Sequence, residues 1–371
     1  MKITIVTDAW SPQVNGVVRT LKMMCEQLSA RGHELQVISP DLFWSMPCPT
    51  YPEIRLAPFA RRKVAKMIRR FAPEVIHIAT EGPLGLTARQ ICVRNSFSFT
   101  TAYHTKFPEY VNARTHLPVN WGYQFLRWFH SPSEGVMVAT NSIDNELKSR
   151  GICNTRRWSR GVDIELFHPR HKKPLECLEG REGPTLVYVG RVAVEKNIEA
   201  FLKLDHPGTK LIVGDGPQRQ SLERDYPDAI FVGSKSGEEL AQHFAAGDVF
   251  VFPSLTDTFG LVMLEAMACG VPVVGYPVAG PIDVVGAEGR GTRTGWDEPV
   301  GAVDKDLSKA IERALKIKND APRRYAEFFS WEACADQFLA NLVQNPEERI
   351  AELSEALASE AIEIFPSDRA A

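Results

Sequence analysis

The sequence of 371 residues has no apolar run long enough to cross a bilayer, and the run at residues 2–7 is too short for a signal peptide. Its 43 basic and 46 acidic residues leave a formal net charge of −3, which argues against nucleic acid as a partner. The seven cysteines are scattered without a C-x-x-C pair, so we expect reduced packing residues and no disulfide framework or zinc site. A cytoplasmic protein is therefore expected.

Two common enzyme signatures are also missing. The first strand–loop–helix unit contains no G-x-G-x-x-G, so dinucleotide binding by that fingerprint is not supported. No Ser-His-Asp order or nucleophile elbow stands out, and the Asp-x-Asp motif at Asp304 and Asp306 is typical of a helix cap. We expect neither a metal nor a cofactor.

Short apolar runs alternate with helical patterns along the chain. This alternation predicts parallel strands separated by helices. Strands are expected at residues 2–7, 34–39, 74–78, 97–103 and 135–140, and again at 185–190, 210–214, 229–233, 248–252 and 271–275. We predict the α/β class, with Rossmann-like domains at 1–165 and 185–330 that face each other across a cleft and are joined by a turn-rich linker at 166–184.

The most informative stretch is FPSLTDTFGLVMLEAMACGVPVV, at residues 252–274. A buried strand ends where it begins, and a helix is expected over residues 260–269, ended by Gly270. Glu265 is the only charged residue of that helix. Because an unpartnered buried carboxylate costs several kcal/mol, something polar must meet it.

The start of this helix is a candidate anion site. Its first amides point beyond the strand end, where unsatisfied N–H groups and the positive end of the helix dipole favour an anion; they belong to Phe259, Gly260 and Leu261. The alternative is structural: Asp257 or Thr258 is an ordinary N-cap, and Glu265 pairs with a basic neighbour.

The stretch resembles the donor-site signature of retaining GT-B glycosyltransferases, the family that includes sucrose synthase and bacterial mannosyltransferases. In that family two acids eight positions apart flank a Phe-Gly turn, and here they are Asp257, where Glu is usual, and Glu265. The resemblance implies a GT-B fold in which Glu265 accepts hydrogen bonds from the ribose hydroxyls, while Asp257 and the amides after it hold the sugar and phosphate. It also implies a helix at 331–345 that crosses back to the first domain, and the pattern beyond it predicts an acidic helical tail at 346–371.

Further residues gain roles through the same resemblance. Arg191 and Lys196 follow the strand at 185–190, and the family places Arg and Lys there against the diphosphate, although the bare pattern fits a solvated surface pair. Gly214 and Val232 lie in turns that look like family turns near the nucleotide. The family has a histidine facing the sugar donor near His104, although a lone histidine after a strand is more often structural. We assign His104, Arg191, Lys196 and Asp257 to the catalytic set.

Three residues of the first domain complete the candidates. Gly16 allows close backbone approach by a ligand near the end of the first strand, or simply makes a tight turn. His77 lies within an apolar strand and is assigned to the core. Glu81 lies in the segment 80–85, which resembles a family loop on the acceptor side, but it stands where Pro is more usual and its role is open.

The acceptor is suggested by a narrower resemblance. Segments 7–20, 103–105, 160–163 and 256–260 are similar to bacterial lipid glycosyltransferases, a group with mannosyl-, glucuronosyl- and sulfoquinovosyl-diacylglycerol synthases. The pattern at 61–71 predicts a basic helix with one apolar face, and residues 121–129 are rich in aromatics. Both features suit an anionic bilayer surface, and both also fit an ordinary sheet-covering helix and a core aromatic cluster.

Together these points predict a metal-independent retaining glycosyltransferase, peripheral on the inner face of the cell membrane. It would transfer glucose, mannose or glucuronic acid from a UDP- or GDP-sugar to diacylglycerol or a glycolipid. The alternatives are a saccharide or small-molecule acceptor, a nucleotide-sugar 2-epimerase on the same fold, and a non-catalytic nucleotide-binding module.

Overall fold

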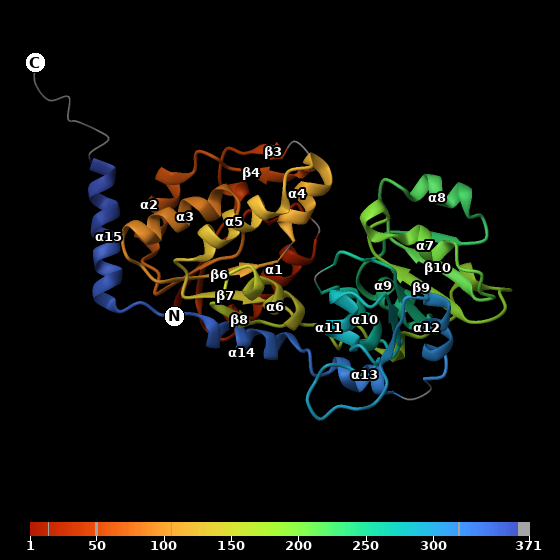
Figure 1. Ribbon diagram of the computed structural model, residues 1–371. Coiled ribbons are helices and arrows are strands. Elements are labelled where there is room, and N and C mark those ends of the chain that lie inside the picture. The colour runs from red at the N-terminus through yellow and green to blue at the C-terminus, as the bar shows by residue number, and fades with distance from the viewer. Residues whose placement is uncertain (14, 49–50, 105, 258, 318–319, 363–371) are drawn as a thin grey trace, which may run out of the picture. The chain divides into compact units, whose positions relative to one another are not determined.

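The computed structural model describes residues 1–13, 15–48, 51–104, 106–257, 259–317 and 320–362, which form two compact units (Figure 1). Unit 1 comprises Met1–Ser159 together with the C-terminal segment from Cys334, and unit 2 comprises Arg160–Ala333. The chain therefore leaves unit 1 and later returns to it. The segment 166–184, which the sequence predicts as a linker, falls within unit 2.

Unit 1 is built on a six-stranded parallel sheet in the order β2-β1-β5-β6-β7-β8. Its strands are β1 (Lys2–Val6), β2 (Glu34–Ile38), β5 (Val75–Ile78), β6 (Phe99–Tyr103), β7 (Gly135–Val138) and β8 (Thr155–Arg157). A separate antiparallel pair is formed by β3 (Met46–Cys48) and β4 (Tyr51–Leu56). The helices are α1 (Gly16–Ala30), α2 (Arg61–Phe71), α3 (Pro83–Arg94), α4 (Phe107–Thr115), α5 (Val119–His130), α6 (Asn141–Ser149) and α15 (Glu347–Ile362), together with α14 (Trp331–Asn341), whose first three residues belong to unit 2.

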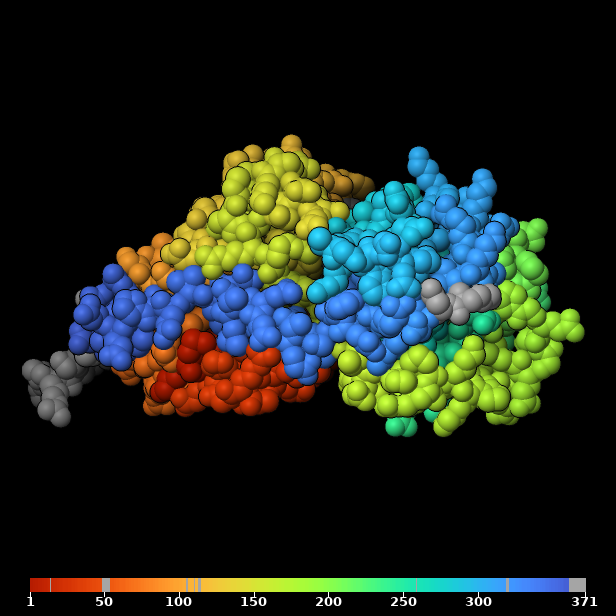
Figure 2. Space-filling view, turned by 90° about the horizontal axis from the view of Figure 1, so that it is seen from below, coloured from red at the N-terminus to blue at the C-terminus, as the bar shows by residue number. Residues whose placement is uncertain are grey.

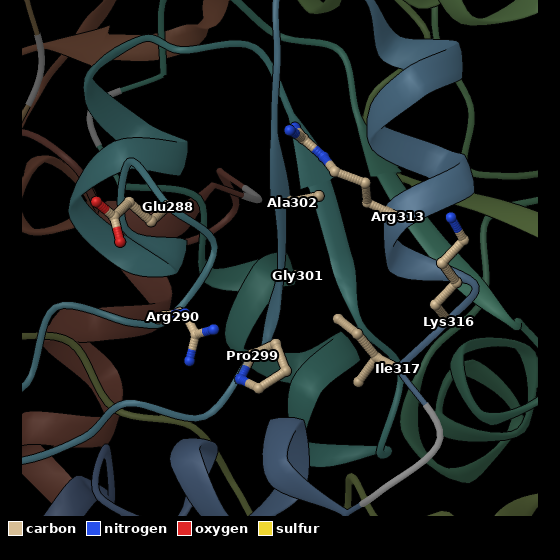
Figure 3. A pocket seen from close by; sticks show the side chains of 8 residues that line it. All are labelled: Glu288, Arg290, Pro299, Gly301, Ala302, Arg313, Lys316 and Ile317. Atoms are coloured by element: carbon tan, nitrogen blue, oxygen red, sulfur yellow. The ribbon is translucent and has the colours of Figure 1, made fainter.

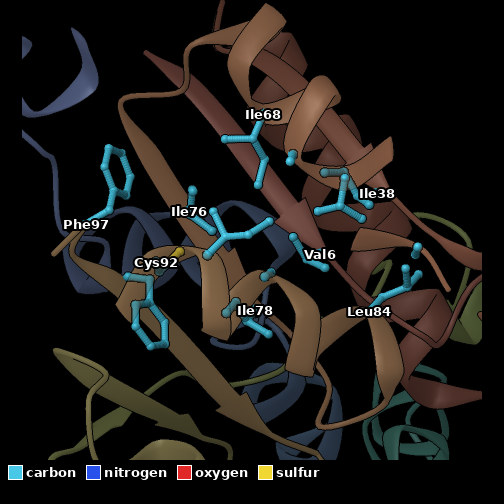
Figure 4. Packing of buried hydrophobic residues seen from close by; sticks show 14 of the residues in the cluster. Val6, Ile38, Ile68, Ile76, Ile78, Leu84, Cys92 and Phe97 are labelled. Atoms are coloured by element: carbon cyan, nitrogen blue, oxygen red, sulfur yellow. The ribbon is translucent and has the colours of Figure 1, made fainter. Parts of the chain in front are cut away.

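Alternate side chains of the strands in unit 1 pack on opposite faces of the sheet. On one face Ile76 and Ile78 of β5 join a buried cluster with Ile68 of α2 and Leu84 of α3 (Figure 4). This apolar cluster fixes the helices α2 and α3 on that face, and with them the turn between β5 and α3.

His77 of β5 is buried on the other face, as the sequence predicts. Its ring lies edge-on to those of Trp158 and Phe338, with centroids 6.0 Å and 4.9 Å away, and its Nδ1 is 2.9 Å from Thr100 Oγ1. Burial lowers the pKa of His77 to about 3, so the ring is neutral at physiological pH. His77 is thus a core residue.

Helix α15 covers the apolar face of α2. Val64 and Ile68 of α2 share one buried cluster with Leu353 and Leu357 of α15. Figure 2 shows the C-terminal segment in blue lying across unit 1 beside the N-terminal residues in red and orange. The sequence predicts the bounds of α2 correctly, and of the two interpretations of its apolar face the core one is confirmed.

Unit 2 contains a second six-stranded parallel sheet, in the order β11-β10-β9-β12-β13-β14. Its strands are β9 (Thr185–Val189), β10 (Thr209–Val213), β11 (Ile230–Gly233), β12 (Val249–Phe252), β13 (Val273–Gly275) and β14 (Gly301–Val303). Its helices are α7 (Ile198–Leu202), α8 (Arg219–Asp225), α9 (Gly237–Ala245), α10 (Leu261–Ala268), α11 (Ala279–Val285), α12 (Leu307–Ala314) and α13 (Ala321–Ala326).

The prediction of two Rossmann-like α/β sheets is confirmed, and each predicted strand is present within a residue or two of its expected ends. The sequence analysis missed three strands of three residues each, β3, β8 and β14, and the six-residue β4 that pairs with β3. Asp306 caps α12 as expected, accepting from the amides of Ser308 and Lys309. Within the described ranges, no helix combines the length and apolar character needed to cross a bilayer.

Candidate functional site

The strand order of unit 2 indicates where its sheet can bind a ligand. From β9 the chain runs to β10 and β11 on one side, and then to β12 on the other side of β9. Ligands of open α/β sheets bind outside the carboxyl ends of the strands at such a reversal. In unit 2 the segments that follow β9 and β12 hold Arg191, Lys196 and Asp257.

Lys196 and Asp257 form an ion pair at this reversal. Lys196 ends a short 3-10 turn, η4 (Val194–Lys196), and its Nζ lies 2.6 Å from Oδ1 and 2.9 Å from Oδ2 of Asp257. The two side chains remain 25% and 19% exposed, so a ligand can reach them. The sequence analysis gives these residues separate roles, whereas the structure joins them, so that each sets the position of the other.

Helix α10 holds Glu265 in the interior of unit 2. The residue is only 2% exposed and lies between the buried Leu264 and Ala266. Burial, with the nearby Glu265 charge as a smaller cause, raises the pKa of the Cys269 thiol to about 12. A carboxylate held in such surroundings strengthens any hydrogen bond that a ligand hydroxyl donates to it.

The turn before α10 depends on Gly260. Its φ of 81° is left-handed, and a Cβ there would come within 2.8 Å of the Phe252 ring.

Gly260 is the N-cap of α10, and among the described residues no side chain caps this helix start, so Asp257 is not its cap. Thr258, the other cap candidate, lies outside the described residues. The first amides of α10, that of Leu261 included, remain suited to an anion, while the Phe259 side chain is buried.

Three further predicted residues, Gly214, Arg191 and Val232, lie in or just after β9 to β11, and they differ in how closely they pack. A Cβ on Gly214 would lie 1.9 Å from the carbonyl oxygen of Gly190, so contact between the loops after β9 and β10 requires this glycine. Arg191 is 49% exposed, with Nη1 4.0 Å from Glu195 Oε1. Val232 lies in β11, the edge strand, with β10 between it and β9.

Two predicted residues lie in unit 1. Gly16 begins α1 directly after Asn15, whose Oδ1 accepts from the amides of Val17 and Val18 at 3.0 Å. His104 follows β6, and its ring lies edge-on to that of Trp158, with centroids 5.6 Å apart. The predicted set is thus divided: the residues from Arg191 onward belong to unit 2, and these two belong to unit 1.

Asp8 is a buried carboxylate to which the sequence analysis gives no role. It follows β1 and caps α3, because its Oδ1 accepts from Leu84 N at 3.0 Å and its Oδ2 accepts from Thr80 Oγ1 at 3.0 Å and Gly85 N at 3.3 Å. A Cβ on Gly82 would lie 2.4 Å from Asp8 Cγ. An acid at a strand end, together with a Gly-Pro helix start elsewhere in the chain, is the only sequence signal for this contact.

Asp8 is expected to make the stability of the protein depend on pH. Burial raises its pKa to about 6, against 3.8 when it is unperturbed. Its contribution is therefore fully present below about pH 4 and is lost as the pH rises through 6, by about 3 kcal/mol. Urea unfolding of the wild type and of Asp8→Asn between pH 4 and 7 measures this: the wild type should lose stability relative to the variant. Parallel curves would contradict the prediction.

A solvent-facing cavity of about 570 Å³ in unit 2 lies apart from these residues (Figure 3). Its lining includes Arg290, Arg313 and Lys316, but Arg290 donates to the Asp297 carbonyl and Arg313 pairs with Asp304. None of the predicted site residues lines it. Throughout the described part of the chain, no group of three or more His, Cys, Asp or Glu side chains is arranged to hold a metal ion.

Solved structures share this fold. Sucrose-phosphate synthase from Thermosynechococcus elongatus matches with a TM-score of 0.67 at 22% identity, over 91% of this chain and 97% of that one. HepE of Anabaena matches with a TM-score of 0.60 at 15% identity, over 98% of this chain and 100% of that one. Two parallel-sheet units with these neighbours define the GT-B class.

Sequence comparison then gives the family. Residues 183–316 match "Glycosyl transferases group 1", and residues 14–166 match "Glycosyltransferase Family 4". The chain is 30% identical to a GDP-mannose-dependent alpha-mannosyltransferase of Mycolicibacterium smegmatis, over 92% of this chain and 96% of that protein. It is 31% identical to a sulfoquinovosyl transferase of Arabidopsis thaliana, over 86% of this chain and 69% of that protein. The chain belongs to this glycosyltransferase family.

Proposed function

We propose that the protein is a metal-independent retaining hexosyltransferase that uses a UDP- or GDP-sugar and a lipid acceptor. The observation that carries the donor half is the buried Glu265, in a helix that starts at the strand-order reversal of unit 2. The relatives' names include a GDP-mannose-dependent enzyme, and the HepE structure is a complex with UDP. These support a nucleoside diphosphate sugar as the donor.

The residues of unit 2 suit three parts of such a donor. Glu265 accepts hydrogen bonds from the ribose hydroxyls, and the amides at the start of α10 receive the phosphate. Lys196 stabilises the negative charge that grows on the departing diphosphate, together with Arg191, which is half exposed. Asp257 holds Lys196 and takes a sugar hydroxyl on its exposed side. No divalent ion is needed for this charge balance.

Retention of configuration, by a path without an enzyme nucleophile, is the stereochemical outcome that we propose. Retaining hydrolases use a carboxylate as nucleophile, with a second carboxyl about 5–5.5 Å away. Asp257 engages Lys196 with both oxygens, which lowers its nucleophilicity, and Glu265 is buried. We therefore propose that the acceptor attacks on the face that the diphosphate leaves, and that the leaving phosphate takes the acceptor's proton.

The relatives favour a lipid acceptor. Besides the sulfoquinovosyl transferase, an alpha-monoglucosyldiacylglycerol synthase of Streptococcus pneumoniae is 27% identical over 74% of this chain and 71% of that protein. Both names concern transfer of a sugar, and the second concerns transfer to diacylglycerol. Diacylglycerol or a glycolipid is the acceptor class that we propose.

The surface of unit 1 around α2 suits an anionic bilayer. The exposed face of α2 carries Lys63, Lys66 and Arg70, while its apolar face belongs to the core. Trp44 and Phe59 are 70% and 87% exposed, with ring centroids 6.3 Å apart. Each cation near an anionic surface contributes about 1 kcal/mol, and exposed aromatic rings suit the headgroup region.

The aromatic stretch at residues 121–129 contributes less to that surface than its composition indicates. Tyr123 and Phe129 are buried in unit 1, whereas Trp121 and Trp128 are 62% and 48% exposed. The ring of Trp128 is covered by the Arg89 guanidinium, whose Cζ is 3.9 Å from the ring centroid. Part of the stretch is therefore core.

A donor and acceptor screen tests the proposal. The full chain is incubated with labelled UDP- and GDP-sugars and with vesicles that contain diacylglycerol, either in anionic or in zwitterionic lipid. We expect transfer from one donor, retention of configuration, activity in the presence of EDTA, and a rate several-fold higher on anionic vesicles. Transfer only to saccharides, or turnover of the donor without any acceptor, would contradict the lipid assignment.

A further inference from the structure

The loop after β9 carries both cations of the proposed donor site, and it is held at each end. At its start, Tyr188 Oη donates to the Arg191 carbonyl at 2.9 Å. At its end, α7 packs into the core of unit 2 through Ile198 and Phe201, which are 1% and 0% exposed. The short turn that ends in Lys196 therefore joins two fixed points.

Asn197 makes this join with a left-handed backbone. Its φ of 54° and ψ of 33° lie in a region that L-residues other than asparagine and aspartate rarely adopt, whereas glycine enters it freely. Among the described residues of unit 2, Asn197 is the only residue other than glycine with a positive φ. Its N–H donates to the Val194 carbonyl at 3.0 Å, which closes the turn η4, and the same residue begins α7. The backbone of Asn197 thus sets the direction in which the chain leaves Lys196.

The side chain of Asn197 fastens this loop to the loop after β12. Its Nδ2 donates to the carbonyl of Pro253 at 3.1 Å, and Pro253 directly follows β12. Four residues further on lies Asp257, the partner of Lys196. Two neighbouring residues of one loop, Lys196 and Asn197, therefore both contact the other loop. A shift of one loop against the other would stretch both contacts.

A lysine that stabilises a departing charge needs such support. Its ammonium group sits on a flexible four-carbon stem, so its position depends on what holds the two ends of the side chain. Asp257 holds the ammonium end of Lys196, and the contacts of Asn197 hold the backbone end. Such a cation acts fully only when it is already in place, and a misplacement of about 1 Å can cost on the order of 10²-fold in rate.

We propose that Asn197 is a positioning residue for Lys196. Its left-handed backbone directs the lysine toward Asp257 and the departing diphosphate, and its side-chain amide keeps the loop against the segment after β12. In this role Asn197 contacts neither the sugar nor the phosphates, and it acts only through Lys196. The inference rests on the proposed glycosyl transfer, and it names a residue that controls how well that site receives the leaving group.

Two substitutions separate the backbone from the side chain. Asn197→Gly keeps the left-handed turn and removes only the amide, so kcat should stay within about 3-fold of the wild type. Asn197→Ala removes the amide and also disfavours the turn, so kcat should fall by about 10–30-fold. Calorimetry adds a measurement that a merely structural role would not change. In Asn197→Ala the preference for a nucleoside diphosphate over the monophosphate should fall at least about 3-fold, with the monophosphate Kd unchanged within about 2-fold.

A control and a double variant complete this experiment. Asn95→Gly removes an amide of the same kind in unit 1, where Nδ2 donates to the Ile91 carbonyl at 2.8 Å, and it should leave kcat within about 2-fold. In the Lys196→Met background, Asn197→Ala should lower kcat by less than about 2-fold, because it acts through the missing lysine. Four results would each overturn the proposal: normal kcat in a folded Asn197→Ala, Asn197→Gly as slow as Asn197→Ala, equal loss of affinity for both nucleotides, or independent effects in the double variant.

Asn197→Asp decides the matter if Asn197→Ala does not fold. Aspartate also tolerates the left-handed turn, but its carboxylate cannot donate to the Pro253 carbonyl, and it competes with Asp257 for the ammonium of Lys196. The diphosphate preference should again fall at least about 3-fold, and an unchanged preference would contradict the positioning role. If the wild type binds nucleoside diphosphates but transfers no sugar from any donor, the proposed function fails, while this ratio of affinities still decides the role of Asn197.

Discussion

Glu265→Gln is expected to lower kcat/KM for glycosyl transfer by about 10²–10⁴-fold, because hydrogen bonds to a charged group contribute roughly 1.5–3 kcal/mol each and the proposed contact involves two ribose hydroxyls. The substitution keeps the volume of a side chain that is only 2% exposed, so the core around α10 stays filled. Nucleotide affinity should fall together with turnover, because the contact that we propose for Glu265 is with the nucleoside and not with the reacting carbon.

The comparison for this variant is Glu312→Gln, which removes an exposed carboxylate from α12 of the same unit. It should leave kcat/KM within 2-fold of the wild type, and both variants should unfold at the wild-type temperature. Turnover of Glu265→Gln within 3-fold of the wild type, with normal folding, would show that the donor binds elsewhere.

Lys196→Met is expected to lower kcat by about 10²–10³-fold, the size of effect seen when one preorganised donor to a developing negative charge is removed. The loss is large because two effects add. The departing diphosphate loses its cation, and the Asp257 carboxylate, which now touches Nζ at 2.6 Å and 2.9 Å, is left uncompensated beside it. Removing that second charge should recover part of the loss, so Lys196→Met/Asp257→Asn should turn over about 10-fold faster than Lys196→Met.

Lys235 provides the control, because its Nζ lies 2.5 Å from Glu239 Oε1 in an ion pair elsewhere in unit 2. Lys235→Met should change kcat by less than 2-fold, as is usual when a surface ion pair is broken. Single and double variants at Lys196 and Asp257 with strictly additive effects would mean that the pair does not act as one unit in the reaction.

Local patterns predict the parts of the fold that short-range chemistry decides. The spacing of apolar residues at 61–71 predicts the bounds of α2, and Gly260 and Gly270 mark the two ends of α10. Both predictions succeed because helix periodicity and helix-end signals depend only on residues close together in the sequence. Short edge strands such as β8 and β14 carry three residues each and too little alternation to be recognised. The burial of Glu265 is foreseeable for the same reason, since its neighbours are all apolar.

Contacts between distant residues could not be predicted from the sequence. The apolar face of α2 fits a membrane and a core equally well, and only Leu353 and Leu357 near the other end of the chain decide between them. Likewise, nothing in the pattern indicates that Lys196 meets Asp257, or that His130 at the end of an aromatic helix meets Glu81. Such pairings arise when strand order brings loops together.

The path of the chain through the two units sets an order for biosynthesis. Unit 2 is complete once Ala333 has been made, whereas unit 1 still lacks α15, whose Leu353 and Leu357 close the apolar face of α2. At roughly 5–20 residues per second, the ribosome needs on the order of 10–40 s to pass from the end of the first part of unit 1 to that helix. During this interval the apolar face of α2 lacks the cover that Leu353 and Leu357 give it in the finished chain.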